Sequence, residues 1–330
     1  MTETVLVTGG TGFVGNWVVL KALEKGYKVK TSVRNLNKEK QLRDSLVETS
    51  SKLTKEVVDS NLELFIADLT SDAGWLENFK DVDYVLHVAS PFPAVQPKDP
   101  NELIVPAVEG TLRILRIAAQ FPSVKNVVVT SSFAAVGFGH DPKRTEPFTE
   151  VDFTKVEGVP HIPYVQSKTL AEQAAWKYVK DNQVSYYLTV LNPAYIFGPP
   201  LKNGTGFGTS LGLIQNLLNG TRKDGVPSMY LSVVDVRQLA DLHVESLTNP
   251  RAKGERFIVH AGPNITLLDV ANILRESLPP SQTGDLPTTE LSGPKDYSKN
   301  SDISKVKTTF NWTPYSISET LVATVEGFDL

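Results

Sequence analysis

The chain contains no cysteine among its 330 residues. This absence excludes disulfide bonds, thiolate metal ligands and a nucleophilic thiol. The sequence also lacks a run of 18 apolar residues, the length that a helix needs to cross a bilayer. Its 33 basic residues form no dense block of the kind that binds nucleic acid. We therefore expect neither a membrane segment nor a nucleic-acid partner.

A metal site is not expected either. None of the five histidines has the spacing to another histidine or to an acid that metal ligands require. The N-terminus passes from Met1 into an apolar run without the basic region and cleavage site of a secretory signal, which favours a cytoplasmic location. With 41% apolar residues the chain can bury a large core, and its net charge of -4 is modest.

The first two thirds of the sequence contain a regular alternation of short β-branched runs with longer helical patterns. This alternation is typical of parallel strands joined by crossover helices. Most runs are apolar on both faces, as in a sheet covered on both sides. The sequence predicts an α/β fold with a Rossmann-type doubly wound parallel sheet. The expected strands are 5–8, 28–33, 63–66, 84–88, 126–131 and 186–191, and the expected helices are 12–25, 38–50, 72–79, 101–120 and 165–181.

A glycine-rich turn follows the first expected strand. Gly9, Gly12 and Gly15 stand three residues apart, and an apolar helical pattern accompanies them. Glycine has no side chain to keep a phosphate away from the backbone, and the following helix directs its positive end at the anion. A glycine triplet alone is a weak signal, but its position between the first strand and the first helix predicts a dinucleotide-binding turn.

The end of the second expected strand indicates which dinucleotide is bound. An NAD-specific protein would carry an acid there to hold the ribose 2′-hydroxyl, whereas this chain has Arg34, with Lys38 one helical turn beyond. A guanidinium can hold a 2′-phosphate with two hydrogen bonds. We therefore expect NADPH/NADP+ as the cofactor, although Arg34 could instead be a solvated surface charge.

A second group of polar residues surrounds the start of the helix near 165–181. Tyr164 and Lys168 stand four residues apart, which places both side chains on one helix face. Upstream, Ser131 and Ser132 follow the fifth expected strand, and ligands of doubly wound folds bind at the carboxyl ends of the strands. The two signals support each other, because both fall where a nicotinamide bound to the glycine turn would end.

The pattern of alternation stops after Asn192, where prolines and glycines crowd into a short stretch. We predict that residues 1–193, with a returning helix and strand within 235–260, form a cofactor-binding Rossmann domain. Residues 194–234 and 261–330 would then form a smaller substrate-binding lobe, which closes with an amphipathic helix near 316–327.

Taken together, these motifs resemble the extended short-chain dehydrogenases/reductases. The resemblance is closest to the dihydroflavonol reductase-like branch, with yeast-type methylglyoxal and ketone reductases and cinnamoyl-CoA reductases. It covers almost the whole chain. The segments that carry it are 7–13 (VTGGTGF), 87–91 (HVASP), 130–132 (TSS), 164–176 (YVQSKTLAEQAAW) and 192–199 (NPAYIFGP).

The resemblance implies an NADPH-dependent reduction of aldehydes and ketones to alcohols. Tyr164 would donate a proton to the carbonyl oxygen, Lys168 would assist it and bind the ribose, and Ser132 would donate a hydrogen bond to the substrate oxygen. A free phenol has a pKa of about 10, so we expect Lys168 and the oxidised nicotinamide to stabilise the phenolate. Ser131 is the less suitable serine, because neighbouring strand residues point to opposite faces.

The resemblance also assigns binding residues. The segments that we expect to cover the nicotinamide are mainly apolar, which predicts a small-molecule carbonyl substrate with an aliphatic or aryl body. The protein is expected to be a monomer or a homodimer. The expected cofactor contacts are Gly9, Thr11, Gly12, Phe13, Val14, Arg34, Lys38, Asp68, Leu69, Ala89, Ser90, Thr130, Tyr164, Lys168 and Pro193. The expected substrate contacts are Phe92, Phe133, Phe197 and Val234.

One departure and two alternatives accompany this interpretation. Many members of the family have an asparagine before the Gly-Thr pair of the fourth helix, where this chain has Glu109, which argues against a water relay at that point. A nucleotide-sugar epimerase or dehydratase would share Tyr164 and Lys168 but keep its cofactor bound through the cycle. A non-enzymatic NADP-sensing regulator would share the glycine turn, but such proteins typically lose the tyrosine and lysine.

Overall fold

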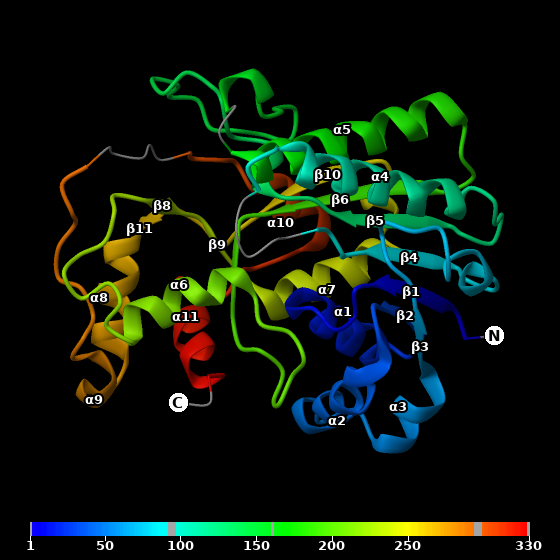
Figure 1. Cartoon of the computed structure of the whole chain (residues 1–330), viewed down its shortest axis with the longest axis horizontal. Coiled ribbons are helices and arrows are strands. Elements are labelled where there is room, and N and C mark those ends of the chain that lie inside the picture. Colours follow the sequence, from blue (N-terminus) through cyan, green and yellow to red (C-terminus); the bar gives the residue numbers. More distant parts are fainter. Residues whose placement is uncertain (1, 92–96, 160–161, 294–298, 329–330) are drawn as a thin grey trace.

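The computed structural model of the chain describes residues 2–91, 97–159, 162–293 and 299–328. Its centre is a seven-stranded parallel sheet with the strand order β10-β6-β5-β4-β1-β2-β3, as Figure 1 shows. The order reverses between β1 and β4, which is the switch point of a doubly wound fold. The predicted Rossmann-type sheet is confirmed. Its strands are β1 (Thr4–Thr8), β2 (Lys28–Val33), β3 (Leu62–Ile66), β4 (Tyr84–His87), β5 (Asn126–Thr130), β6 (Tyr187–Pro193) and β10 (Arg256–Val259).

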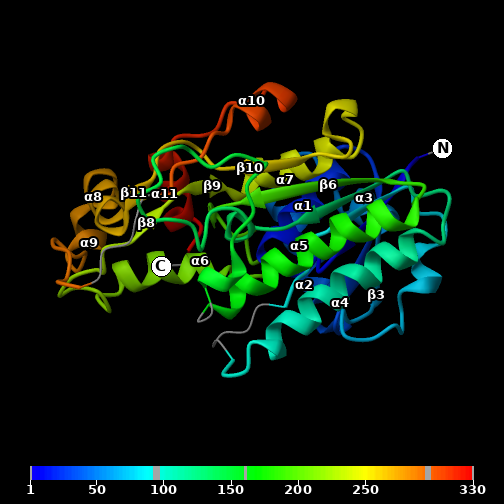
Figure 2. The ribbon, with the colours of Figure 1, turned by 90° about the horizontal axis from the view of Figure 1, so that it is seen from above.

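Helices cover both faces of this sheet. α4 (Asn101–Ala118) and α5 (Pro163–Asn182) lie side by side on one face, whereas α1 (Phe13–Glu24) and α7 (Val236–Ser246) pack together on the other (Figure 1 and Figure 2). In the described part of the chain, no helix is both long and apolar enough to cross a membrane. Between β2 and β3 the chain forms α2 (Glu39–Thr49) and α3 (Lys55–Asn61).

Alternation along the strands divides the core into two clusters. In β1, Val5 and Val7 pack in the cluster that includes the apolar side chains of α1, whereas Leu6 packs in the cluster that includes those of α4. β5 repeats the arrangement, with Val128 in the first cluster and Val127 in the second. All five side chains are fully buried. The central strands are apolar on both faces along their middle positions because both faces of the sheet are covered.

The remaining elements lie mainly at one end of the sheet, beyond the carboxyl ends of β5 and β6 (Figure 1). They include two small sheets, β7 with β9 and β8 with β11. The division into a cofactor domain and a substrate lobe stays a prediction. The elements are β7 (Tyr195–Phe197), α6 (Thr209–Leu218), β8 (Tyr230–Leu231), β9 (Val233–Asp235), β11 (Ile265–Thr266), α8 (Leu267–Ser277), α9 (Pro280–Thr283), α10 (Ser304–Phe310) and α11 (Ile317–Glu326).

One expected helix was wrong. The segment 72–79 was predicted to be helical, but only Leu76–Phe79 forms a helix, and it is a short 3-10 helix. Gly74 stands before it with φ of 82°, a left-handed conformation that interrupts an α-helix, and a Cβ there would lie 2.1 Å from the Ile66 carbonyl oxygen. The close approach of the chain to the end of β3 therefore takes precedence over the local helical pattern.

Candidate active site

The glycine turn is shaped by contacts within the protein at some positions and left open at another. Gly9 has φ of 74°, and a Cβ there would lie 2.9 Å from the Cβ of Ala89. A Cβ on Gly15 would lie 2.1 Å from the Gly9 carbonyl oxygen. Gly12 differs, because its Cβ would meet only the Gly9 carbonyl oxygen, at 3.3 Å. The fold itself therefore requires Gly9 and Gly15, whereas the space beside Gly12 is available to a ligand.

This turn opens into a cavity of about 430 Å³ at the carboxyl ends of β1 to β4. Two basic residues, Arg34 and Lys38, stand at one side of it, in keeping with a 2′-phosphate site. Among the described residues of its lining the one carboxylate is Asp68, whose pKa is lowered by hydrogen bonds from Thr70 and by the nearby charge of Arg34. The cavity is lined by Gly9, Thr11, Gly12, Ser32, Val33, Arg34, Lys38, Ala67, Asp68, Leu69, Thr70, Trp75, Ala89, Ser90 and Pro91.

The loop after β7 reaches back over the glycine turn. The Thr205 hydroxyl donates to the Thr11 carbonyl oxygen at 3.0 Å, and Lys38 Nζ donates to the Thr205 carbonyl oxygen at 3.0 Å. A Cβ on Gly206 would lie 2.4 Å from the Phe13 backbone nitrogen. A segment of the predicted substrate-binding lobe therefore contacts both the glycine turn and Lys38 directly.

Six expected cofactor contacts lie outside the described lining of this cavity: Phe13, Val14, Thr130, Tyr164, Lys168 and Pro193. Phe13 and Val14 begin α1, and Phe13 packs in the core. Thr130 and Pro193 end β5 and β6. The Thr130 hydroxyl is 2.7 Å from His243 Nε2, and its carbonyl oxygen accepts a hydrogen bond of 3.5 Å from the Lys168 ammonium. Thr130 therefore lies beside Lys168 and not among the described residues that line this cavity.

The three expected catalytic side chains come together at the carboxyl edge of the sheet. α5 begins at Pro163, so Tyr164 lies in its first turn and Lys168 one turn later. The Ser132 side chain, which caps a short 3-10 helix by accepting from the Ala134 backbone N–H at 3.1 Å, hydrogen-bonds to Tyr164. Lys168 Nζ lies 6.0 Å from the centroid of the Tyr164 ring.

Ser131 and Ser132 take opposite directions, as strand alternation predicts. Ser131 is buried, and its hydroxyl donates to the Glu172 carboxylate at 2.6 Å. Ser132 instead lines a second cavity together with Tyr164. The placement supports Ser132, not Ser131, as the serine that faces a substrate.

Burial governs the pKa values of the two principal groups. It lowers the pKa of Lys168 to about 8, and the negative charge of Glu172 opposes that shift. It also raises the pKa of Tyr164, and the nearby Tyr195 adds to the rise, whereas the hydrogen bond from Ser132 lowers it. The pKa of Tyr164 rises because the cost of removing a phenolate from water outweighs the stabilisation by the Ser132 hydrogen bond.

The second cavity has a volume of about 460 Å³ and lies beside Tyr164 and Ser132. Most of its lining is apolar, and it includes Phe133, one of the four expected substrate contacts. Its lining residues come both from before and from after Asn192, where the alternation of strand and helix patterns stops. The lining residues are Ser132, Phe133, Ala134, Phe138, Ile162, Tyr164, Val165, Ala194, Tyr195, Thr209, Ser210, Leu213, Met229, Tyr230, Ser232, Asn264 and Lys299.

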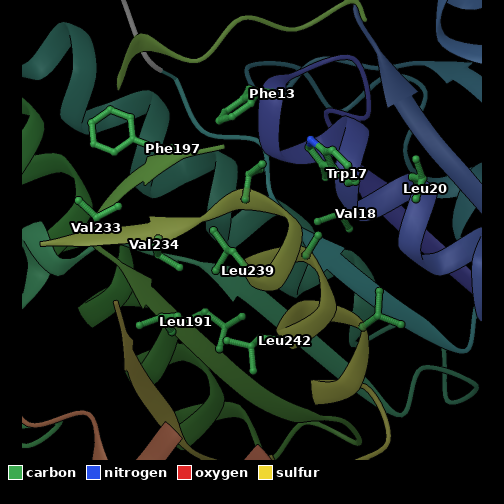
Figure 3. Packing of buried hydrophobic residues seen from close by; sticks show 14 of the residues in the cluster. Phe13, Trp17, Val18, Leu20, Leu191, Phe197, Val233, Val234, Leu239 and Leu242 are labelled. Carbon is green, nitrogen blue, oxygen red and sulfur yellow. The ribbon is translucent and has the colours of Figure 1, made fainter. Parts of the chain in front are cut away.

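Two of the expected substrate contacts need correction. Phe197 and Val234 are fully buried in the hydrophobic core and do not line the cavity, and Figure 3 shows both among the clustered side chains. The reason is pairing between β7 and β9, in which Ile196 stands opposite Val234 and Phe197 opposite Asp235, with the core behind them. The fourth expected contact, Phe92, lies outside the described residues.

Several lining residues were not anticipated from the sequence. Tyr195 lies within the segment 192–199 that carried the family resemblance, so its motif could have identified it. Asn264 and Lys299 come from separate segments and carried no local signal. Lys299 Nζ lies 5.0 Å from the ring centroid of Phe138, which also lines the cavity. Within the described ranges, no three potential metal ligands cluster.

Comparisons with known proteins agree with this geometry. The model of the NAD dependent epimerase/dehydratase family matches residues 5–262. A cinnamoyl-CoA reductase of Medicago truncatula is 37% identical over 287 residues, 85% of this chain and 82% of that protein. An uncharacterised oxidoreductase of Schizosaccharomyces pombe is 36% identical over 291 residues, 84% of this chain and 83% of that protein. The solved structure of yeast methylglyoxal/isovaleraldehyde reductase complexed with NADPH is similar with a TM-score of 0.83 and 28% identity, and the match covers 98% of each chain.

Proposed function

Because the chain belongs to the NAD dependent epimerase/dehydratase family of extended short-chain enzymes, we propose that it is an NADPH-dependent carbonyl reductase. The observation that carries the proposal is the meeting of Ser132, Tyr164 and Lys168 between a basic cavity at the glycine turn and an apolar cavity beside the sheet. The first cavity suits a dinucleotide, and the second suits a small carbonyl compound.

The residues of the first cavity fit NADPH. The open space at Gly12 lets a pyrophosphate approach the backbone at the positive end of α1. Arg34 and Lys38 would hold the 2′-phosphate, since both are exposed in the lining of the cavity and Arg34 stands where an acid would repel it. The yeast reductase with the similar fold was solved with NADPH, which supports the same assignment.

When bound, NADPH supplies the hydride that is added to the carbonyl carbon. Ser132 donates a hydrogen bond to the carbonyl oxygen, where negative charge develops. Tyr164 gives its proton to that oxygen, so the substrate leaves as an alcohol and the tyrosine is left as a phenolate. The raised pKa of Tyr164 suits a group that must hold its proton until the substrate is in place.

Lys168 makes the proton transfer reversible by stabilising the phenolate. Its ammonium group is held by the Thr130 carbonyl oxygen close to the Tyr164 ring. With a pKa near 8, Lys168 is charged at neutral pH and can lose its proton slightly above it. The site thus keeps a buried cation beside the group that becomes an anion.

The lining of the second cavity supports aldehydes, ketones or diketones with an aliphatic or aryl body. Phe133, Phe138, Leu213 and Met229 supply an apolar surface, and no arginine appears among the lining residues that the structure describes. A diphosphate of a nucleotide sugar would lack the bidentate partners that such groups normally meet. The names of the related proteins, a cinnamoyl-CoA reductase and a methylglyoxal/isovaleraldehyde reductase, point to carbonyl substrates as well.

The test is NADPH consumption by the purified protein over a panel of aldehydes, ketones and diketones, with chiral analysis of the alcohols formed. We expect turnover of several apolar members and a strong preference for NADPH over NADH. Tightly held NAD, no net consumption of NADPH and conversion of nucleotide sugars would instead indicate an epimerase. The cytoplasmic location and the monomer or homodimer state stay predictions, for cell fractionation and light scattering to check.

A further inference from the structure

Behind the catalytic serine lies a set of four polar side chains, here called the buried polar cluster: Ser131, Glu172, Asn192 and Arg256. The Glu172 carboxylate is its centre, since it accepts from the Ser131 hydroxyl and from the Asn192 amide, each at 2.6 Å. Arg256 Nε lies 2.7 Å from the other carboxylate oxygen. The cluster joins α5 to three neighbouring strand ends, those of β5, β6 and β10.

The cluster is sealed from solvent. Glu172 is 1% exposed, Asn192 0%, and Arg256 and Ser131 6% each. An ionised pair at such a depth gives up several kcal/mol of hydration per ion and is often no more stabilising than apolar residues of the same size. Asn192 Oδ1 and Arg256 Nη2 even lack hydrogen-bond partners within the described structure. Stability alone therefore does not account for the cluster.

The cluster is connected to the catalytic residues by two routes. The Asn192 amide that contacts Glu172 also donates to the Ser132 carbonyl oxygen at 3.1 Å, so it fixes the backbone from which the Ser132 hydroxyl projects. Glu172 also stands one helical turn after Lys168 on α5. Since a carboxylate favours the charged form of a nearby lysine, Glu172 opposes the effect of burial on Lys168.

We propose that Glu172 is a positioning residue of the active site, which holds Ser132 through Asn192 and keeps Lys168 in its ammonium form. The inference rests on the proposed carbonyl reductase function. Glu172 is not among the described residues that line the second cavity. It therefore acts through Ser132, which lines that cavity, and through Lys168, which assists Tyr164 there.

The other groups around Lys168 do not supply the same charge. His87 faces it from β4, and burial together with the lysine lowers the pKa of His87 to about 3, so this histidine is neutral. Tyr164 faces it from the same helix and carries a proton. Arg256, which faces Glu172 from β10, is a second cation. Loss of the Glu172 charge would leave unopposed the burial that lowers the pKa of Lys168.

The central experiment compares Glu172→Gln with Trp176→Phe. Gln keeps the size of the side chain and one acceptor oxygen but removes the charge. Phe at position 176 removes a different donor to the same carboxylate, the indole N–H at 3.2 Å, and leaves the charge in place. We expect Glu172→Gln to lower kcat by about tenfold or more, with the NADPH Kd within about twofold of wild type and the alkaline limb of the pH profile moved to lower pH. Trp176→Phe should keep both kcat and the limb.

Two further variants separate the routes and guard against misfolding. Asn192→Ala should lower kcat without moving the alkaline limb, because it breaks the link to Ser132 and leaves the charge of Glu172. Glu172→Asp retains the negative charge, so the alkaline limb of the pH profile should stay at its wild-type position even if kcat falls. These two remain informative if Glu172→Gln fails to fold.

A readout independent of turnover is the titration of the Lys168 ammonium by NMR. In Glu172→Gln its pKa should fall below that of wild type. A folded Glu172→Gln protein with wild-type kcat, alkaline limb and Lys168 titration would show that the cluster is only structural and would overturn the inference. Absence of carbonyl reduction by the wild type would instead contradict the proposed function, and the NMR titration would still decide the role of Glu172.

Discussion

The two cavities of this molecule differ in how the chain builds them. The cavity at the glycine turn uses residues within 9–91, and most of them lie at or just after the carboxyl ends of the first four strands. The cavity beside Tyr164 uses residues from 132 to 299, drawn from loops, helix ends and small strands far apart in the sequence. The first is polar and basic at one side, and the second is mainly apolar. A cofactor site that is tied to strand ends is therefore fixed by the fold, whereas the substrate site depends on how distant segments pack.

The largest effect separates binding from chemistry. Tyr164→Phe should reduce turnover by about a thousandfold, because it removes the proposed proton donor, and should leave the NADPH Kd within about twofold. Tyr195→Phe is the matched control, since it removes the neighbouring phenol of the same cavity and should cost less than about tenfold. Steady-state rates with a fluorescence titration of NADPH would measure both. Equal losses in the two variants would argue against Tyr164 as the acid.

The second effect belongs to the cofactor cavity alone. Arg34→Ala should weaken NADPH binding by about 10- to 100-fold, since a charged hydrogen bond contributes about 1.5–3 kcal/mol, and should leave NADH binding unchanged. Arg43→Ala is the control, because this nearby arginine pairs with Glu39 at 2.8 Å and does not line the cavity. Calorimetric titration with both cofactors would decide, and equal losses for NADPH and NADH would remove the 2′-phosphate assignment.

The third effect tests the two kinds of glycine in the turn. Gly15→Ala should lower the Tm by several degrees, because its methyl group would lie 2.1 Å from the Gly9 carbonyl oxygen. Gly12→Ala should lower the Tm less, since its backbone is extended with φ of -86° and its Cβ would lie 3.3 Å from the Gly9 carbonyl oxygen, but should weaken NADPH binding about tenfold or more. Calorimetric melting and titration measure the pair. An opposite ranking would mean that no ligand occupies the space beside Gly12.

The fourth effect is a pH dependence. Burial lowers the pKa of Lys168 to about 8, so reduction should fall as the pH rises past 8, where the ammonium loses its proton. The same shift has a consequence for stability: between about pH 8 and 10.5 the unfolded chain binds more protons than the native one, so this lysine opposes folding less as the pH rises. Rate profiles and urea unfolding at several pH values, compared with Lys168→Met, measure both. A flat rate profile to pH 10 would contradict the role of Lys168.

The smallest effect concerns the substrate cavity. Lys299→Met should change the ratio of kcat/KM between carboxylated and neutral aldehydes by only a few fold, because Lys299 is partly exposed and its charge is screened. The NADPH Kd should stay at the wild-type value. A large change in NADPH affinity would show that the two cavities are not separable.

The sequence was sufficient for those features in which local chemistry and position in the fold agree. The glycine turn, Arg34 and the Tyr164–Lys168 pair each stand at a strand end or a helix start that has a clear local pattern. Nine of the expected cofactor residues line the first cavity for this reason: Gly9, Thr11, Gly12, Arg34, Lys38, Asp68, Leu69, Ala89 and Ser90.

Where tertiary packing decides, the sequence was not sufficient. Phe197 and Val234 have the apolar character of a substrate wall, but the pairing of β7 with β9 places them in the core. Asn264 and Lys299 carry no motif, and only the folded chain brings them beside Phe138 and Tyr164. The contact between Glu172 and Arg256 spans 84 positions and was likewise beyond any local pattern.

Hydride transfer itself is the central claim, and NADPH with deuterium at both C4 positions tests it most directly. The protein is incubated with this cofactor and an apolar ketone, and the product is analysed by mass spectrometry and NMR. The account predicts one deuterium on the carbinol carbon of the alcohol for each NADPH oxidised, and none with Tyr164→Phe over the same period. An alcohol without deuterium, or substrate that changes while NADPH stays reduced, would contradict it.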